Sequence, residues 1–398
     1  MRITPAAELE HRCSRLQSRM AEAGLDAVIL VQNADLFYFT GSIQNGCLYV
    51  PLDGQPLYLV RRDFGRARME SGLKEVVPFT SPRDIPRILA QYGYPTPQRV
   101  GLEFDVLPVL FYERFRAVFP TATFIDATPA IRLVRMIKSH YEIHAMMDAG
   151  QQVDKVYRRA CEVIREGMTD LELAAELEYV ARRGGHLGLI RMRVFNGEML
   201  FGHTFSGTDS AVPTYTDTPF GGMGTSPAFG QGASYKPIGR NEPIIIDFAG
   251  SCDGYLVDQT RVFVIGNLSD RLRRAHDAML QVHARMKELA PQRPTWGGLY
   301  DECLELARRL GYGDNFMGAP GSQVSFVGHG LGVEIDEFPF IAKGFHEMTL
   351  EPGMAWAFEP KAVFPGEGVV GIEDTFYLAD DGTLRQLTPS PEELVVLS

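Results

Sequence analysis

Four acidic residues stand inside segments that otherwise read as buried β-strands: Asp247, Asp258, Glu359 and Glu373. Aspartate is unfavourable in strands, and a buried carboxylate is costly unless it is paired or holds a cation. The positions of these side chains therefore need a chemical reason. A divalent metal ion bound between them is the obvious candidate.

The first pair is expected on a β-hairpin. If residues 251–254 form a four-residue loop, Gly250 faces Tyr255 and Asp247 lies directly opposite Asp258. Cross-strand Cβ atoms are about 5 Å apart, so two like charges would repel each other there. A cation between the two carboxylates would remove that repulsion.

The second pair repeats the construction near the C-terminus. A turn centred on Gly366 sets Glu359 opposite Glu373, and His329, flanked by glycines in an apolar stretch, lies between the two hairpins in the chain. Two aspartates, one histidine and two glutamates form a carboxylate-rich set. Such a set suits two hard or borderline divalent ions better than one tetrahedral zinc.

Composition sets a plain background for this chemistry. The 398 residues are 45% hydrophobic and 22% charged, as in ordinary soluble proteins, and are enough for two domains. The net charge of -11 argues against nucleic acid or an anionic membrane as the main partner. Five cysteines without a CxxC pair, and no signal peptide or apolar run that could span a bilayer, predict a cytoplasmic protein.

The N-terminal third alternates helical and strand patterns. Leu9, Cys13, Leu16 and Met20 follow helical spacing along one side of a helix. The sequence predicts helices at 6–23, 63–72 and 84–92, strands at 26–31 and 99–103, and a hairpin of 48–51 with 56–60. This alternation indicates an α/β unit.

The rest of the chain begins with long helical patterns. Thr169 and Glu172 supply the side chains of a capping box, so a helix should start at this point. Helices are predicted at 141–166, 169–183, 269–290 and 295–310, around the segments that carry the acidic residues.

The order Asp, Asp, His, Glu, Glu resembles a known superfamily. The phrases GYLVDQTR, GHGLG, GMAWAFEP and GIED are similar to the metal-site motifs of methionine aminopeptidase, prolidase, aminopeptidase P and creatinase. DLFYFTGS, in the N-terminal third, resembles the loop after the first strand in the prolidase and creatinase branch. The resemblance implies a creatinase/prolidase-type α/β domain at 1–133 and a pita-bread catalytic domain, with a curved antiparallel sheet, at 134–398.

The resemblance also implies a mechanism. Asp247, Asp258, His329, Glu359 and Glu373 would hold two divalent ions, such as manganese, cobalt or zinc, with Asp258 and Glu373 bridging them. A metal-bound hydroxide would attack an N-terminal peptide bond, plausibly in an Xaa-Pro substrate. Glu359 would act as the general base and His329 would be a catalytic residue as well as a ligand. Relatives of this branch suggest a homodimer.

Three positions depart from the pattern of the family. Asp336 stands where a second histidine is usual, Gly371 where an arginine is common, and Phe229-Gly230 where a third histidine is found. His203, in a long glycine-rich region, could take over a catalytic histidine's role, and it could equally be a bystander. The metal ligands are thus complete, whereas the residues that read the substrate have changed.

Those changes leave other functions open. A hydrolase or lyase acting on a small non-peptide molecule, similar to creatinase or ectoine hydrolase, is the main alternative to a peptidase. A binding protein without activity would be expected to have lost ligands, and all five are present. Fold alone does not decide between these classes.

Overall fold

The computed structural model describes residues 2–398, which form two compact units. The first unit runs up to Arg135 and includes Arg193–Gly197, and the second contains Met136–Met192 and Glu198–Ser398. The domain boundary expected after residue 133 stays a prediction. No helix within residues 2–398 combines the length and apolar composition of a membrane span.

The first unit contains a six-stranded mixed sheet with the order β4-β3-β2-β1-β5-β6. Its strands are β1 (Ala27–Leu30), β2 (Gly46–Pro51), β3 (Leu57–Val60), β4 (Val76–Pro78), β5 (Arg99–Leu102) and β6 (Thr123–Asp126). Its helices are α1 (Ala6–Ala23), α2 (Asn33–Thr40), α3 (Phe64–Glu70), α4 (Ile85–Gln91), α5 (Val109–Val118) and α6 (Thr128–Met136), with a short 3-10 turn at Pro82–Asp84. The predicted α/β alternation is confirmed.

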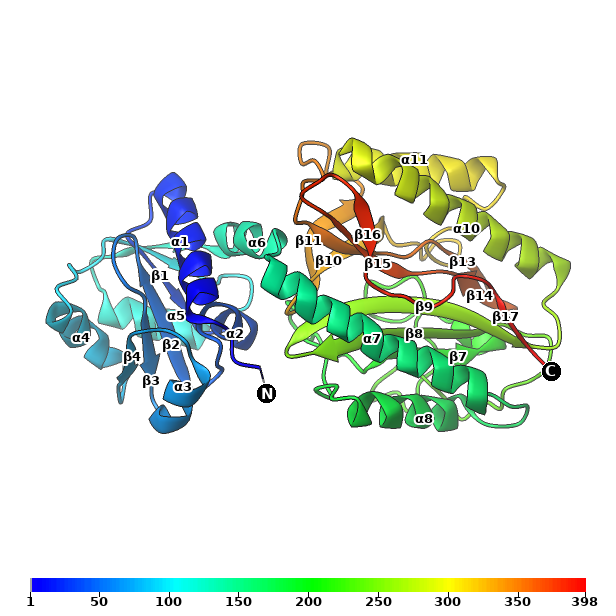
Figure 1. The fold of residues 1–398 in the computed structure, drawn as a ribbon, viewed down its shortest axis with the longest axis horizontal. Coiled ribbons are helices and arrows are strands. Elements are labelled where there is room, and N and C mark those ends of the chain that lie inside the picture. Colours follow the sequence, from blue (N-terminus) through cyan, green and yellow to red (C-terminus); the bar gives the residue numbers. More distant parts are fainter. Residues whose placement is uncertain (1) are drawn as a thin grey trace. The chain divides into compact units, whose positions relative to one another are not determined.

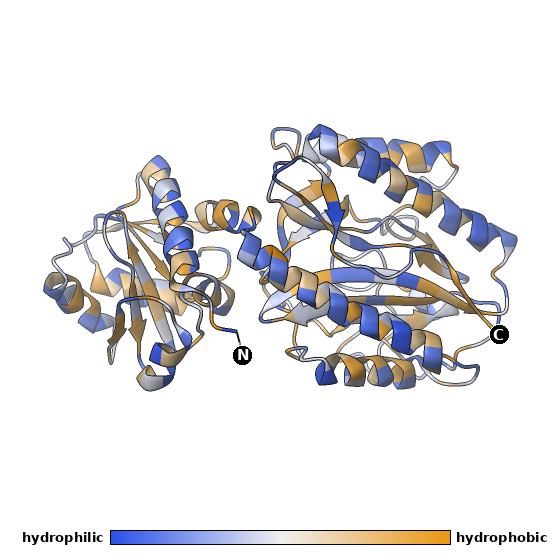
Figure 2. Ribbon diagram, viewed as in Figure 1, coloured by the Kyte–Doolittle hydropathy of each residue, from blue (hydrophilic) through white to orange (hydrophobic). Residues whose placement is uncertain are grey.

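Helices cover both faces of this sheet. Ala27 and Ile29 of β1 belong to one core with buried side chains of α4 and α5. The alternate side chains, Val28 and Leu30, are also buried, as expected for a strand covered on both faces. Figure 2 shows the same pattern as a mainly hydrophobic sheet beneath helices of mixed colour.

The expected loop at 35–41 is wrong, because most of it belongs to helix α2. The Gln32 side chain accepts a hydrogen bond from the Asp35 backbone N–H at 2.9 Å and so caps the start of the helix. Gly41 ends it in the left-handed conformation with φ 76°. Apolar residues on consecutive positions concealed the helical period.

The second unit is built from antiparallel strands and four long helices. The long helices are α7 (His140–Val163), α8 (Asp170–Arg183), α10 (Asp270–Leu289) and α11 (Trp296–Arg309), and short turns are α9 (Gly207–Ser210) and a 3-10 turn at Ala290–Gln292. The helices fall where the sequence predicts them, and Thr169 with Glu172 forms the expected capping box at α8.

Strands of the second unit form three sheets. One has the order β17-β9-β8-β7, one has the order β11-β10-β12-β15-β16, and β13 pairs with β14. The strands are β7 (Gly202–Ser206), β8 (Ile244–Cys252), β9 (Tyr255–Ile265), β10 (Phe326–Leu331), β11 (Ile335–Ala342), β12 (Ala355–Phe358), β13 (Lys361–Phe364), β14 (Gly368–Gly371), β15 (Asp374–Leu378), β16 (Leu384–Gln386) and β17 (Val395–Leu397).

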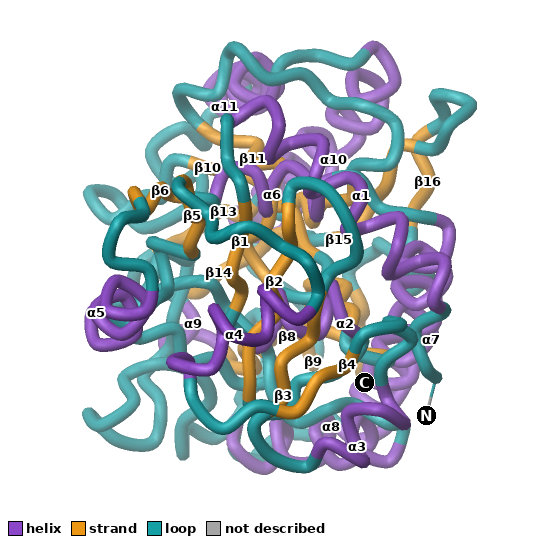
Figure 3. Tube along the Cα trace, turned by 90° about the vertical axis from the view of Figure 1, so that its left-hand side faces the viewer, coloured by secondary structure: helices purple, strands orange, loops and turns teal. Residues whose placement is uncertain are grey.

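The strands of this unit lie between two pairs of helices, α7 with α8 and α10 with α11 (Figures 1 and 3). Helix α7 packs on β8 and β9, and α11 packs on β11. Asp247 and Asp258 lie on β8 and β9, whereas Glu359 follows β12 and Glu373 directly precedes β15.

The register predicted for the first hairpin is wrong by two residues. Asp253 and Gly254 form a two-residue turn with φ values of 47° and 90°, so Cys252 faces Tyr255. Asp-Gly is the preferred pair for such a turn because both positions need positive φ.

The shift does not separate the two aspartates. Asp247 now faces Thr260, and Asp258 faces Ala249. Because side chains alternate with a period of two, a shift of two residues keeps both carboxylates on the same face of the sheet.

The second hairpin has the predicted register. Lys361 faces Gly371 in the β13–β14 pair, and Phe358 faces Asp374 in the β12–β15 pair. Both pairs belong to the alignment that sets Glu359 opposite Glu373.

We predict that His276 makes the second unit sensitive to acid. Burial in α10 lowers its pKa to about 4, and neither ring nitrogen has a hydrogen-bond partner among residues 2–398. The folded-state pKa lies below the unfolded value, so this contribution to stability is complete above about pH 6.5 and is lost as the pH falls towards 4. The His276→Leu variant should lose roughly 2–3 kcal/mol less of its unfolding free energy between pH 7.5 and pH 4.5 than the wild type.

Urea unfolding followed by tryptophan fluorescence measures this effect in the second unit, because both tryptophans, Trp296 and Trp356, are buried there. The control is His144→Leu at an exposed position of α7, which should leave the pH dependence unchanged. Equal pH dependence in the wild type and His276→Leu would refute the prediction.

Candidate metal centre

Two hairpins carry the acidic residues, and direct hydrogen bonds join them. Asp247 lies on β8 and Asp258 on β9. The backbones of Thr260 and Glu373 exchange hydrogen bonds of 3.2 and 3.3 Å, and the Thr260 hydroxyl donates to Glu373 Oε2 at 2.9 Å. The second hairpin is therefore fixed against the first at the position of a predicted ligand.

The order of the neighbouring sheet explains how His329 joins the cluster. His329 on β10 pairs with Ala357 on β12, two residues before Glu359. Its Nε2 atom lies 3.7 Å from Glu359 Oε1 and 3.7 Å from Glu373 Oε1. Adjacent strands thus bring the histidine and both glutamates to one point.

All five predicted ligands meet in this region. Ligand atoms of Asp258, His329 and Glu373 lie within 4.8 Å of one another. These three side chains and Glu359 are buried, and Asp247 is half-buried. The structure therefore brings together the residues that the sequence singles out, although their roles stay predictions.

A residue that the sequence analysis missed lies in the middle of the cluster. Lys361 Nζ is 2.7 Å from Glu359 Oε2, 2.6 Å from Glu373 Oε2 and 3.9 Å from Asp247 Oδ2. Its side chain is fully buried. A signal was present, because alternate residues of an extended chain point to the same face and Lys361 stands two positions after Glu359.

Burial and close contact between charged side chains shift the pKa values of the clustered residues. Burial raises the pKa of Glu359 to about 7, with Lys361 opposing the shift. Burial and the neighbouring carboxylates of Glu373 and Asp247 raise the pKa of Asp258 well above its usual range. Burial alone would lower the pKa of His329, but hydrogen bonding to Glu373 and the adjacent carboxylates raise it to about 10.

His203 reaches the same site from β7. It pairs with Asp247 across the strands, and its Nδ1 atom lies 3.8 Å from Asp247 Oδ2. The imidazole ring is buried and stacks on Phe205 with centroids 5.5 Å apart. The structure places this histidine beside the carboxylates rather than in a remote loop.

Two positions that depart from the expected pattern also border the cluster. Asp336 Oδ1 lies 3.6 Å from His329 Nδ1, so the carboxylate faces the side of the ring opposite Nε2. At Gly371 an added Cβ would lie 2.8 Å from Lys361 Cγ and 2.5 Å from the Pro360 carbonyl oxygen. A larger side chain would therefore collide with Lys361 and its backbone.

Arg261 supports the cluster from behind. Its guanidinium donates to the Glu373 carbonyl oxygen at 2.8 Å and to Asp374 Oδ1 at 2.7 Å. It also donates to the carbonyl oxygens of Thr260, Pro391 and Ser390. One buried side chain thus ties both hairpins to the C-terminal segment.

Fold and site together define a candidate metal-dependent hydrolase. Residues 144–380 match metallopeptidase family M24, and residues 12–137 match the creatinase/prolidase N-terminal domain. The first match covers more than half of the chain, which therefore belongs to metallopeptidase family M24. The expected pita-bread domain and its N-terminal partner are confirmed.

Relatives match over nearly the whole length. The Xaa-Pro dipeptidase of Pyrococcus furiosus is 28% identical over 389 residues, which is 97% of this chain and 100% of the relative. The Xaa-Pro dipeptidase of Lactobacillus delbrueckii subsp. lactis is 25% identical and covers 96% of this chain and 98% of its own. The solved prolidase from Pyrococcus furiosus has a TM-score of 0.76 and 27% identity, with 94% of this chain and all of that chain covered.

Family M24 implies divalent metal ions, and part of the cluster fits one. Asp258, His329 and Glu373 offer two carboxylates and an imidazole at mutual distances that one ion could bridge, with Glu359 Oε1 adjacent. Hard and borderline ions accept this donor set. On the other side of the glutamates, between Glu359, Glu373 and Asp247, stands the ammonium group of Lys361.

We predict that Arg261 is essential for the stability of this centre. Arg261→Met would leave Asp374 and several carbonyl groups buried without their donor, so the unfolding free energy of the second unit should fall by about 3–5 kcal/mol. Urea unfolding followed by tryptophan fluorescence would measure the change. Arg158→Met is the control, because that side chain is 74% exposed beside Asp154 and its loss should cost less than about 1 kcal/mol. Similar losses in both variants would contradict the assigned role.

Proposed function

We propose that this chain is a metal-dependent peptidase that hydrolyses the peptide bond of Xaa-Pro dipeptides. The observation that carries the proposal is the buried cluster of Asp258, Glu359 and Glu373 around His329, in a chain of family M24. Full-length relatives that bear the name Xaa-Pro dipeptidase support the choice of substrate.

The ligand roles follow the geometry of the cluster. Asp258, His329 and Glu373 would hold a divalent ion, with Glu359 at its edge. When bound, the ion supplies Lewis-acid polarisation of the scissile carbonyl and activation of water. Glu359 would accept the proton of the attacking water and pass it to the leaving amine. His203, beside Asp247, would orient that carboxylate or contact the substrate.

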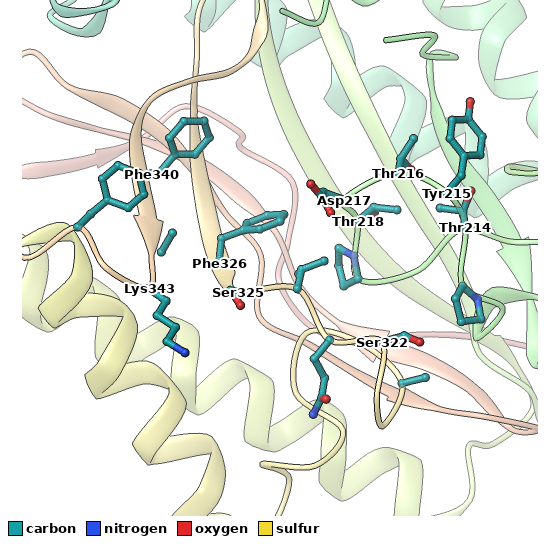
Figure 4. A pocket seen from close by; sticks show the side chains of 17 residues that line it. Thr214, Tyr215, Thr216, Asp217, Thr218, Ser322, Ser325, Phe326, Phe340 and Lys343 are labelled. Carbon is teal, nitrogen blue, oxygen red and sulfur yellow. The ribbon is translucent and has the colours of Figure 1, made fainter. Parts of the chain in front are cut away.

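We propose a pocket of about 690 Å³ as the substrate site, because its wall includes residues 322–326, which lead into the strand that carries His329. It is formed by the loop 213–219, the segment 322–326 and the end of β11, as Figure 4 shows. Phe326 lines it, and the centroid of this ring is 6.4 Å from that of His329. Asp217 and Lys343 contribute opposite charges to its wall, as a zwitterionic dipeptide would require.

The identity and number of the metal ions, the cellular location and the oligomeric state are proposed next. We propose manganese, cobalt or zinc as the metal, because the donor set accepts each of them. The resemblance implies two ions, Asp247 being a ligand of the second. We also propose a cytoplasmic location, because the five cysteines lack a disulfide framework and fit a reducing compartment. A homodimer is proposed from the resemblance to the prolidase branch.

A second function is favoured by the altered surroundings of the ligands. Asp336 and Gly371 replace groups that the family uses to bind a peptide substrate. A hydrolase or lyase acting on a small non-peptide molecule would need a different set of contacts at these positions. Creatinase-like or ectoine hydrolase-like chemistry is the form that this alternative would take.

We predict that Glu359→Gln abolishes turnover while the protein remains folded. Removal of a general base typically costs a factor of 10²–10⁴ in rate, and the loss of a neighbouring ligand oxygen adds to this. The metal-free protein would be reloaded with manganese, cobalt or zinc and given Xaa-Pro and Xaa-Ala dipeptides, with products followed by mass spectrometry. Metal-dependent release of proline is the expected result.

The matched control is Glu347→Gln, at an exposed position, which should keep the activity of the wild type. If the metal-loaded wild type cleaves no peptide, the peptidase proposal fails. Amidines, cyclic amides and other non-peptide substrates would then be tested with the same variants.

A further inference from the structure

The carboxylates of Glu359 and Glu373 each turn one oxygen to His329 and the other to Lys361. Their Oε1 atoms lie 3.7 Å from His329 Nε2, where an ion also bound by Asp258 would sit. Their Oε2 atoms lie 2.7 and 2.6 Å from Lys361 Nζ. The two glutamates therefore bridge a metal-binding half and an ammonium-binding half.

The ammonium-binding half has the ligands that a second ion would need. Asp247 Oδ2 completes it at 3.9 Å from Lys361 Nζ. An ammonium group offers three N–H donors and no lone pair when charged. It can therefore satisfy carboxylate oxygens as a cation does, but it excludes a metal ion from the same space.

The surroundings hold Lys361 in this place. Its carbonyl oxygen accepts a hydrogen bond from Met317 N–H at 2.9 Å, and its backbone pairs with Gly371. Its Nζ atom lies 5.0 Å from the centre of the buried Phe220 ring, which favours a cation. Gly371 has no side chain, and this absence leaves room for the Lys361 stem.

The charge balance agrees with this arrangement. Four carboxylates meet here: Asp247, Asp258, Glu359 and Glu373. A buried carboxylate must be neutralised by pairing, protonation or a cation. One divalent ion and one ammonium supply three positive charges, so the cluster of four carboxylates keeps a single net negative charge without a second divalent ion.

We propose that Lys361 takes the place of the second metal ion, so that the chain holds one divalent ion beside a fixed ammonium group. This inference rests on the proposed metal-dependent function. It makes Lys361 a positioning residue for Glu359 and Glu373, and it assigns Asp247 to the lysine rather than to a metal.

Metal content tests the proposal on the wild-type protein without any assay of activity. The full chain would be saturated with Mn²⁺, freed of excess ion, and measured by elemental analysis and electron paramagnetic resonance. We expect one Mn²⁺ per chain and the spectrum of an isolated ion. Two tightly bound ions per chain with an exchange-coupled spectrum would overturn the proposal, as would no bound ion at all.

The Lys361→Ala variant tests whether the lysine is the reason. Removing the ammonium group leaves the oxygens of Asp247, Glu359 and Glu373 without their cation, so the variant should bind two Mn²⁺ per chain, and the coupled spectrum should appear. A variant that still binds one ion would overturn the assignment to Lys361. If the variant does not fold, the wild-type stoichiometry and spectrum decide.

Lys138→Met is the matched control, because Lys138 is also fully buried and its Nζ lies 2.9 Å from Glu337 Oε2. This variant should bind one ion, like the wild type. A second ion in the control would mean that any uncovered carboxylate recruits Mn²⁺, and would overturn the inference. Failure of the proposed function is separate: one ion per chain without peptidase activity refutes the function alone, and two ions with activity refute this inference alone.

Discussion

Neutralisation of buried carboxylates is the constraint on which the second unit depends. Asp247, Asp258, Glu359 and Glu373 cannot share one apolar layer as free anions, because each would lose its hydration without a partner. The fold places partners on several sides of them: the imidazole of His329 from β10, the ammonium of Lys361 from β13, and a group of ligand atoms that could hold a divalent ion. The two hairpins, joined at Thr260 and Glu373, hold these groups in register.

The same principle operates one layer behind the site. Arg261 pairs with the Asp374 carboxylate and donates a hydrogen bond to the Glu373 backbone carbonyl. These contacts hold the strand in place without using the side chain of Glu373. This separation leaves Glu373 free to interact with His329 and Lys361. Successive side chains of an extended chain point to opposite faces. Glu373 therefore faces the site, whereas the adjacent Asp374 faces Arg261.

Much of this was predictable from the sequence. Carboxylates inside apolar segments identified the candidate ligands that the structure brings together, and helical periodicity with capping residues predicted α7, α8, α10 and α11. The sequence predicts a four-residue loop at 251–254, because that segment is polar and contains glycine. The structure has a two-residue turn at Asp253-Gly254, and this dipeptide is itself a turn signal. The role of Lys361 could not be read from spacing alone, since a strand lysine usually faces solvent. Arg193 belongs to the first unit, where it pairs with Asp35 and Asp105, and contacts between residues so far apart in the chain have no local sequence signal.

Positions 371 and 361 are linked through the pairing of β13 with β14. A Cβ at 371 would lie 2.8 Å from Lys361 Cγ and 2.5 Å from the Pro360 carbonyl oxygen, so a side chain at this position would meet both the lysine stem and the neighbouring backbone. The glycine that stands where the family commonly has an arginine therefore leaves room for Lys361 among the carboxylates. The proposed ammonium-binding half depends on both residues.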